Sequence, residues 1–285
     1  MRLRIAVVVA TAVMWGQTPA PRINAGGVVS AGLSTPVVRT VAPNSILSVF
    51  GENFASAGTA RLVGSADLVN GRLPENLGGV CVEIGGQRAR IFHLFPTQIN
   101  IQAPTLTGTG PRAVQVVLNC GATGETKSNT EMVPAQAVAP EFFFFVRNTD
   151  GRNPIAAIDA ATGALIGTPR LADRFPDPKP RFVAARPNQV ITFFLTGLGR
   201  TDPPFEAGVL PDRVAPTAER VVVTFNSIMG LMTPEILYAG AAPGLAGLYQ
   251  INLRVPSDAP DFDLQVAARI GGVTTPVGAY LSVER

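Results

Sequence analysis

Few side chains in this sequence could carry out chemistry. His93 is the only histidine, so a Ser-His-Asp or Cys-His site would have to use it. No Gly-x-Ser-x-Gly motif accompanies it, and the matching position in an internal repeat of the chain is Tyr238. A histidine that corresponds to a tyrosine fits a packing position. We therefore predict no catalytic residue and a non-enzymatic protein.

Metal and cofactor sites have equally little support. One histidine and two cysteines cannot make a zinc site of usual composition. Asp258, Asp261 and Asp263 lie close together, and loop carboxylates can bind Ca²⁺. Their spacing is not that of an EF-hand loop and favours a solvated turn. No Walker or dinucleotide-binding motif follows an expected strand, so we expect no cofactor and no metal.

Cys81 and Cys120 are the only cysteines, and an even pair in an exported protein favours a disulfide. Closing a loop of about 40 residues would stabilise the fold by ~4 kcal/mol. Strand alternation complicates this pairing, because residues 80–84 place Cys81 on the face of Glu83, whereas residues 114–120 place Cys120 with the apolar set. A bridge needs Cys120 to lie beyond its strand, where Gly121 bends the chain. Free thiols are the alternative.

The N-terminus predicts export. Arg2 and Arg4 precede an apolar run of eleven residues, 5–15, which is too short to span a bilayer. A basic start, a short apolar core and small residues up to Ala20 are typical of a cleaved signal peptide, residues 1–20. An uncleaved anchor is the alternative. No later stretch has the length of a membrane helix, so we expect no transmembrane segment in the mature chain and a periplasmic, outer-surface or extracellular location.

The charge balance excludes a nucleic-acid partner. The chain has 23 Lys and Arg against 20 Asp and Glu, and loss of Arg2 and Arg4 would leave 21 against 20. Nucleic-acid binding needs a much stronger positive field. The locally basic stretch 170–186 is interpreted as a solvated insertion, with contact to an anionic polysaccharide or lipid headgroup as the alternative.

Composition predicts an all-β fold. Gly and Pro are abundant, with 29 and 25 residues, while only 15% of residues are charged and 46% are hydrophobic. Many turns, few charges and many Val, Thr and Phe indicate short strands. No segment longer than about 12 residues outside residues 1–20 carries a convincing helical period.

A weak internal repeat indicates the architecture. Residues 43–51 (PNSILSVFG) reappear as 187–195 (PNQVITFFL), residues 91–93 as 236–238, and residues 98–104 (QINIQAP) as 250–256 (QINLRVP). The offset grows from 145 to 152, which places a seven-residue insertion within 239–249 of the second copy. We therefore predict two tandem immunoglobulin-like β-sandwiches, residues 24–138 and 139–285, after the signal peptide.

Several local features carry expectations of their own. Gly85-Gly86 and Gly271-Gly272 predict hairpins, the first followed by a strand over residues 89–92. Residues 141–146 (EFFFFV) read as a strand with two apolar faces, and we expect the second face to be covered by the first sandwich or by residues 153–187. An ordinary first strand is the alternative. Asn100 and Asn252 stand among apolar residues, and we expect each amide to bond to a loop backbone.

The chain resembles a known family at these motifs. Residues 42–54 (APNSILSVFGENF), 77–80 (LGGV), 95–104 (FPTQINIQAP), 196–199 (TGLG) and 238–252 (YAGAAPGLAGLYQIN) are similar to the uncharacterised Solibacter-type C-terminal domain of Acidobacteria. The resemblance covers residues 24–284. It implies exported immunoglobulin-like or IPT/TIG-like modules and brings no catalytic residues. The cysteine pair and residues 170–186 depart from the family pattern.

These observations favour a surface adhesion or assembly module whose partner is an extracellular protein or glycan. A carbohydrate-binding module is the alternative. Sugar platforms use flat, partly exposed aromatic rings, and the only tryptophan, Trp15, lies in the predicted signal peptide. Tyr238, Tyr249 and Tyr280 remain, and two of them belong to motifs that read as structural. The sequence does not identify ligand-binding residues.

Overall fold

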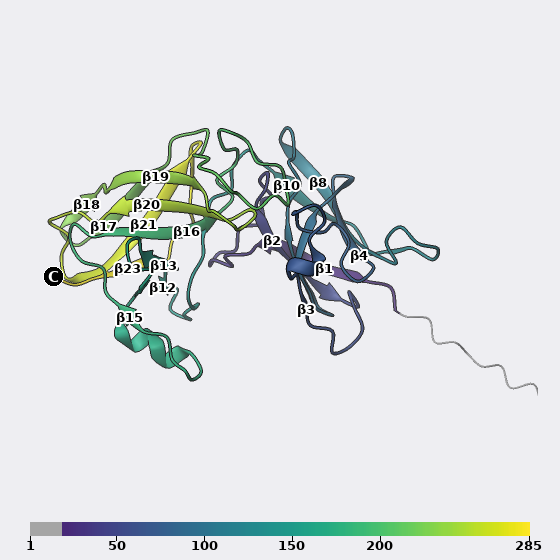
Figure 1. Ribbon diagram of the computed structural model, residues 1–285, viewed down its shortest axis with the longest axis horizontal. Coiled ribbons are helices and arrows are strands. Elements are labelled where there is room, and N and C mark those ends of the chain that lie inside the picture. Colours follow the sequence, from purple (N-terminus) through teal and green to yellow (C-terminus); the bar gives the residue numbers. More distant parts are fainter. Residues whose placement is uncertain (1–18) are drawn as a thin grey trace, which may run out of the picture.

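The computed structural model describes residues 19–285, so the predicted signal peptide falls almost wholly outside the described residues. The protein has an all-β, β-sandwich fold, as the sequence predicts, with two short 3-10 helices at Ser65–Asp67 and Pro169–Arg174. Within residues 19–285 the strands form four sheets. Two sheets come from residues 22–135, here called the N-terminal half, and two from residues 141–283, the C-terminal half. Figure 1 shows the two halves side by side along the longest axis.

The N-terminal half consists of two five-stranded sheets. The first sheet has the order β1 (Arg22–Ser30), β2 (Ile46–Glu52), β7 (Gln98–Gln102), β6 (Arg90–Leu94), β3 (Arg61–Leu62). The second has the order β10 (Glu131–Ala135), β8 (Gly110–Leu118), β4 (Val80–Ile84), β5 (Gln87–Arg88), with β9 (Thr126–Lys127) beside β8. Alternate side chains of both sheets share one buried cluster, in which Val82 of β4 and Ile101 of β7 are fully enclosed.

The C-terminal half repeats this plan with additional short strands. Its first sheet has the order β15 (Phe182–Val183), β14 (Leu165–Ile166), β13 (Ala157–Asp159), β16 (Val190–Thr196), β20 (Tyr249–Arg254), β19 (Glu235–Ala241), with β11 (Glu141–Phe142) beside β16. Its second has the order β12 (Asn153–Pro154), β23 (Ala279–Val283), β21 (Phe262–Ile270), β17 (Val222–Ser227), β18 (Gly230–Met232), with β22 (Val273–Thr274) beside β21.

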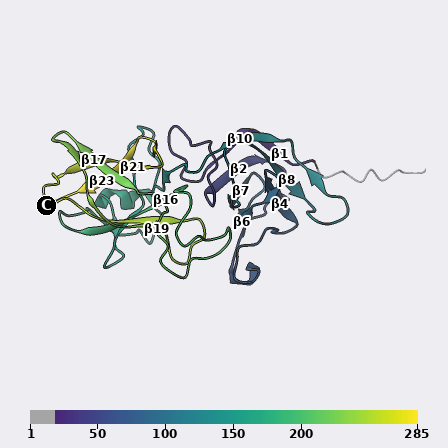
Figure 2. The same cartoon turned by 90° about the horizontal axis from the view of Figure 1, so that it is seen from above.

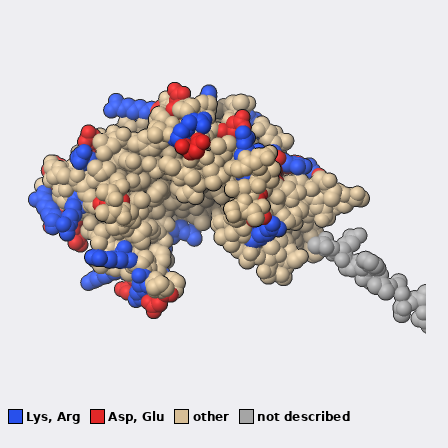
Figure 3. Space-filling model, in the orientation of Figure 1, with Lys and Arg blue, Asp and Glu red and all other residues tan. Residues whose placement is uncertain are grey.

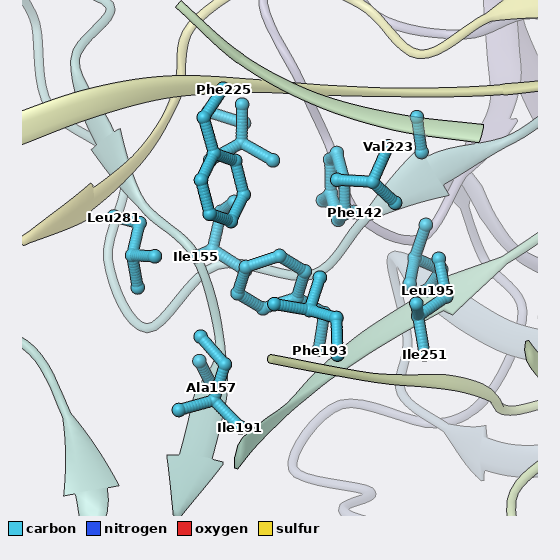
Figure 4. Packing of buried hydrophobic residues seen from close by; sticks show 14 of the residues in the cluster. Phe142, Ile155, Ala157, Ile191, Phe193, Leu195, Val223, Phe225, Ile251 and Leu281 are labelled. Carbon is cyan, nitrogen blue, oxygen red and sulfur yellow. The ribbon is translucent and has the colours of Figure 1, made fainter. Parts of the chain in front are cut away.

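Aromatic rings fill the centre of the C-terminal half. Phe193 lies between Phe142 and Phe225, with ring centroids 5.9 Å and 6.3 Å away. Figure 4 shows these rings packed among aliphatic side chains from both sheets. All three phenylalanines are at most 1% exposed, and burying a ring of this size contributes roughly 1.5–3 kcal/mol.

The sequence repeat is also a repeat of topology. The order β2-β7-β6 in one half matches β16-β20-β19 in the other, and β10-β8-β4-β5 matches β23-β21-β17-β18. Even the irregularities correspond, since the β6–β7 register shifts between Ile91 and His93, and the β19–β20 register shifts between Ile236 and Tyr238.

The two repeated asparagines form a matched pair of contacts, but the expected loop-backbone partners are wrong. The Ser48 hydroxyl donates to Asn100 Oδ1 at 3.2 Å, and the Thr192 hydroxyl donates to Asn252 Oδ1 at 2.9 Å. Each asparagine lies directly opposite its hydroxyl residue on the adjacent strand. A cross-strand side-chain pair therefore gives the amide oxygen a donor in both halves.

Two strand expectations also need correction. The strand β11 covers only Glu141–Phe142, because the following residues leave the sheet, and Phe145 instead packs edge-on against Phe182 at 5.0 Å. Residues 153–187 therefore cover part of the phenylalanine run at 142–145, through Phe182. After Gly85-Gly86 the hairpin partner is the two-residue β5, and the chain then crosses to the other sheet. The strand expected over residues 89–92 is found there as β6, Arg90–Leu94, and is not the hairpin partner.

The two halves make direct contact. Figure 2 shows the halves adjoining when they are seen from above. The Glu141 carboxylate is fully buried and accepts hydrogen bonds from Gly32 N at 2.9 Å and Ser34 N at 2.8 Å. The backbone N–H of Ile46 donates to Thr196 Oγ1 at 2.7 Å.

Loops of the C-terminal half extend this contact. Gly208 N donates to Gln102 Oε1 at 2.6 Å, and Leu73 N donates to Gly208 O at 3.0 Å. The seven extra residues of the second repeat fall within 239–249, which comprise the end of β19, the β19–β20 connection and the start of β20. A Cβ added to Gly247 in this connection would lie 2.8 Å from the carbonyl oxygen of Asn44. The insertion detected in the sequence therefore packs against the other half. The boundary at residues 138 and 139 stays a prediction.

Candidate interaction surface

The structure joins Cys81 and Cys120 by a disulfide. Cys81 on β4 points away from the sandwich core and forms a small outer cluster with Val117 and Cys120, as strand alternation requires. Cys120 reaches that outer face because β8 ends at Leu118 and the chain turns at Asn119, where φ is +53°. The alternation conflict is thus resolved by the position of Cys120 beyond the strand end.

The polar residues considered for chemistry do not converge. His93 is half-buried on β6 with its ring edge toward Phe95, and this burial lowers the pKa of its imidazole. Asp261 accepts a hydrogen bond from Arg285 N at 2.7 Å, whereas Asp263 lies 3.7 Å from the Arg152 guanidinium. Within residues 19–285, no three His, Cys, Asp or Glu side chains gather as a metal site.

Each of the three tyrosines makes contacts within the protein. Tyr249 is buried and donates to the carbonyl of Gly199, and burial raises the pKa of its hydroxyl. Tyr238 is half-buried and donates to the carbonyls of Ala215 and Ala241. The Arg152 guanidinium covers the Tyr280 ring at 4.0 Å from its centroid.

The most unusual feature of the surface is an apolar hairpin tip. Ile228, Met229 and Leu231 are 87%, 79% and 67% exposed, within four consecutive residues of the β17–β18 hairpin. Isolated exposed hydrophobic residues are ordinary, but a contiguous group of them marks an interaction site or an aggregation liability. We call these three residues the apolar tip.

Local hydrogen bonds fix the apolar tip. Ser227 pairs with Gly230 across the turn, so Ile228 and Met229 are the two loop residues. The Ser227 hydroxyl accepts from Met229 N at 3.1 Å and donates to Gly230 O at 3.2 Å. Gly230 adopts a φ of +119°, which a side chain would disfavour. The turn is therefore closed by serine and glycine, which leaves two large apolar side chains at its apex.

A groove adjoins the hairpin. It has a volume of about 530 Å³ and lies between β17 and β19. Its lining consists of Val221–Val223, Thr233–Ala239 and three residues that precede β17, namely Thr217, Glu219 and Arg220. Val222 and Leu237 on its walls are 38% and 46% exposed. At one end the Tyr238 hydroxyl on β19 donates a hydrogen bond to the backbone carbonyl of Ala215. Burial raises the pKa of that hydroxyl.

Charges around this region are sparse and mixed. Glu235 on β19 pairs with Arg254 at 3.0 Å, and Glu219 and Arg220 line the groove with opposite signs. Figure 3 shows small groups of both signs separated by broad uncharged areas over the visible face. The region therefore suits a partner through shape and apolar contact more than through a single-sign field.

The apolar tip was missed in the sequence reasoning. Hairpin apices usually carry Asn, Asp or Gly, and this apex carries Ile228-Met229. The signal that could have revealed it is an apolar dipeptide between an alternating strand and Gly230. Its exposure depends on the pairing of β17 with β18, which composition alone does not define.

No protein-family model matches this chain, and no curated protein matches it. Among solved structures, the extracellular region of plexin A4 has 13% identity and a TM-score of 0.31, covering 97% of this chain and 20% of the plexin chain. A Bacteroides ovatus protein, SGBP-B of a mixed-linkage glucan utilization locus, solved with a mixed-linkage heptasaccharide, has 11% identity and a TM-score of 0.34, covering 89% and 46%. A structure described as BspA_C_WT has 10% identity and a TM-score of 0.22, covering 87% and 95%.

This chain spans about a fifth of the plexin chain and less than half of the Bacteroides ovatus protein. Likenesses this distant do not bear on what the chain binds. Within residues 19–285, no helix is long and apolar enough to cross a membrane.

Proposed function

We propose that this protein is an exported, non-enzymatic β-sandwich module that binds another extracellular protein in surface adhesion or assembly. The observation that carries the proposal is the apolar tip, where Ile228, Met229 and Leu231 are each at least 67% exposed. Covering apolar surface is favourable by about 25 cal/mol per Å², so a partner that encloses these side chains gains directly from their burial.

Export is supported by two independent features. A basic start followed by a short apolar run is typical of secretion. The Cys81–Cys120 disulfide belongs to an oxidising compartment, because cytosolic reductants keep thiols reduced. Membership of the Solibacter-type C-terminal domain family remains part of the proposal and is supported by the motifs at residues 42–54, 95–104 and 238–252.

The proposal can be tested by site-specific photo-crosslinking. A photoreactive amino acid replaces Met229 in one variant and Val69, which is 58% exposed in the N-terminal half, in the control. Both proteins are incubated with envelope fractions of the source cells. We expect a saturable crosslinked protein with the 229 variant that is absent with the 69 variant and competed by unlabelled wild type. Equal crosslinking at both positions would contradict the proposal.

A second candidate is glycan binding in the N-terminal half. A hollow of about 530 Å³ there is lined by amide and hydroxyl groups, including Asn53, Thr59, Asn119 and Thr126. Such groups recognise sugar hydroxyls by hydrogen bonding. A glycan array with wild type and an Asn53→Ala, Asn119→Ala variant tests it, and binding to a defined sugar that the variant loses would favour this candidate.

A further inference from the structure

We propose that the outer edge of β19 takes up an extended strand from the protein partner, which adds to the sheet beside Glu235–Tyr238. This inference rests on the proposed function and deepens it by naming the form of the partner's binding segment. Three features carry it: the open edge of β19, the covered edge at the same place in the other half, and the apolar groove beside it.

The strand β19 ends its sheet. Its inner edge pairs with β20, and no further strand follows β19 in the described part of the chain. The segment before β17 covers only the C-terminal end of the outer edge, where Thr217 N donates to Ala239 O at 2.9 Å and Ala241 N donates to Ala215 O at 3.0 Å. The first four residues of β19 have no such neighbour strand.

The N-terminal half shows what occupies this place. There β6 corresponds to β19, and its outer edge is paired with β3 through Arg61–Leu94 and Leu62–His93. In addition, Val63 N donates to Phe92 O at 2.9 Å. Phe92 corresponds to Leu237 in the sequence repeat. An extended segment therefore covers this edge at Phe92 and His93 in one half, whereas the matching Leu237 and Tyr238 have no paired segment in the described part of the other half.

The register irregularity in β19 does not block strand addition. Bulges commonly protect sheet edges from pairing. However, β6 has its bulge at the matching position, between Ile91 and His93, and still pairs with β3. The geometry of this edge is thus compatible with an added strand.

The groove defines the chemistry of the occupant. In the N-terminal half the segment after β3 packs along this side of the sandwich, where Ile91 N on β6 donates to Pro74 O at 2.9 Å and Leu77 is buried in the core. In the C-terminal half that side remains as the groove between β17 and β19, with Val222 and Leu237 partly exposed. Side chains alternate across a strand, so the occupant is an extended segment with apolar residues at every second position, facing the groove.

The test is selection from a phage-displayed library of peptides of about nine residues, which is the length of a long strand. The library is panned on the full chain and on a Leu237→Lys variant, because lysine on an edge opposes pairing. Leu237 is 46% exposed, so the variant should keep the wild-type melting temperature. The matched control is Leu62→Lys, the same substitution at a 60% exposed strand leucine in the other half.

We expect enriched peptides with apolar residues at alternate positions, about tenfold weaker binding to Leu237→Lys, and unchanged binding to Leu62→Lys. N-methylation of alternate peptide nitrogens should weaken binding by about tenfold for one set only, because only one edge of an added strand donates to β19. The absence of enriched peptides, or binding indifferent to both Leu237→Lys and N-methylation, would overturn the proposal.

Two further outcomes separate this inference from the proposed function. Concentration-dependent dimers that Leu237→Lys dissolves would assign the edge to a second copy of the chain and overturn the proposal. Crosslinking at Met229 that survives in the Leu237→Lys background would sustain the proposed function and count against strand addition.

Discussion

The buried carboxylate of Glu141 shows how a single residue can hold two halves of a chain together. It is fully enclosed, yet both oxygens are satisfied by the opposite loop: Oε2 accepts from Gly32 N, and Oε1 accepts from both Ser34 N and the Ser34 hydroxyl, the last at 2.5 Å. A buried charge is tolerated only when such donors surround it. The next residue, Phe142, enters the hydrophobic core, so the carboxylate is held at a fixed place.

We predict that Glu141→Ala lowers the free energy of unfolding by about 3 kcal/mol, because two buried backbone N–H groups lose their acceptor. Urea denaturation measures the change. Glu52→Ala is the matched control, since Glu52 is exposed on β2, and a surface change of this kind shifts stability by about 0.5 kcal/mol or less. Equal effects of the two substitutions would contradict this role of Glu141.

His93 gives a second prediction at the scale of one residue. Burial lowers the pKa of its imidazole in the folded protein below the ordinary value of 6.5. Protonation therefore favours the unfolded chain, and the stability associated with neutral His93 is present above pH 6.5 and lost as the pH falls through the lowered value. We expect wild type to lose more stability than His93→Phe between pH 7 and pH 5. Parallel denaturation curves for the two proteins at both pH values would contradict this.

Among the elements, the disulfide joins β4 to the turn after β8. It closes a separation of 39 residues, which corresponds to about 4 kcal/mol of stabilisation in the chain-entropy model. We predict that Cys81→Ser with Cys120→Ser lowers the free energy of unfolding by up to about that amount. Chemical denaturation measures it, and reduction of wild type by dithiothreitol should reproduce the loss. A variant as stable as wild type would show that the bridge contributes little to this sandwich.

The positions of several strands and the correspondence of the two halves were accessible from the sequence, because alternation and the repeat both follow from burial of one strand face. Residues 43–51 and 187–195 contain most of β2 and β16, which occupy equivalent places in their sheets. The partners of Asn100 and Asn252 were not accessible, since they depend on cross-strand register. The same holds for the short β11 and for the groove beside β19, which depend on how connecting segments cover an edge.

The candidate surface illustrates the same limit. Ile228 and Met229 follow β17, and their exposure reflects the absence of a covering segment in the described structure around the hairpin. Periodicity reports which face of a strand is buried and contains little information on which edge is covered. The duplicated halves supply that information here, because β3 covers one edge and its counterpart beside β19 is open.

At the scale of the whole molecule, the insertion in the second repeat connects the halves. The β6–β7 turn of the first copy is short, whereas the β19–β20 connection is longer and lies against the N-terminal half. A Cβ on Gly247 would lie 2.8 Å from Asn44 O and 3.0 Å from Ile46 Cγ1. Gly244, in the same loop, has a similar φ of +75°, and a Cβ there would meet nothing within 4 Å. The two glycines therefore separate backbone strain from contact between the halves.

We predict that Gly247→Leu displaces the loop and opens the contact between the halves, whereas Gly244→Leu leaves it closed. Both variants incur the cost of a left-handed backbone, roughly 1–2 kcal/mol, because φ is +71° at Gly247 and +75° at Gly244. Only the leucine at 247 must also push away the backbone of residue 44. Small-angle X-ray scattering should therefore show a larger radius of gyration for Gly247→Leu alone.

The Cys81→Ser, Cys120→Ser variant is a further control, since it should lose stability without changing the scattering curve. Scattering curves that superimpose for both glycine variants and wild type would mean that the loop does not hold the halves together, and that contacts such as Glu141 with Ser34 suffice without it.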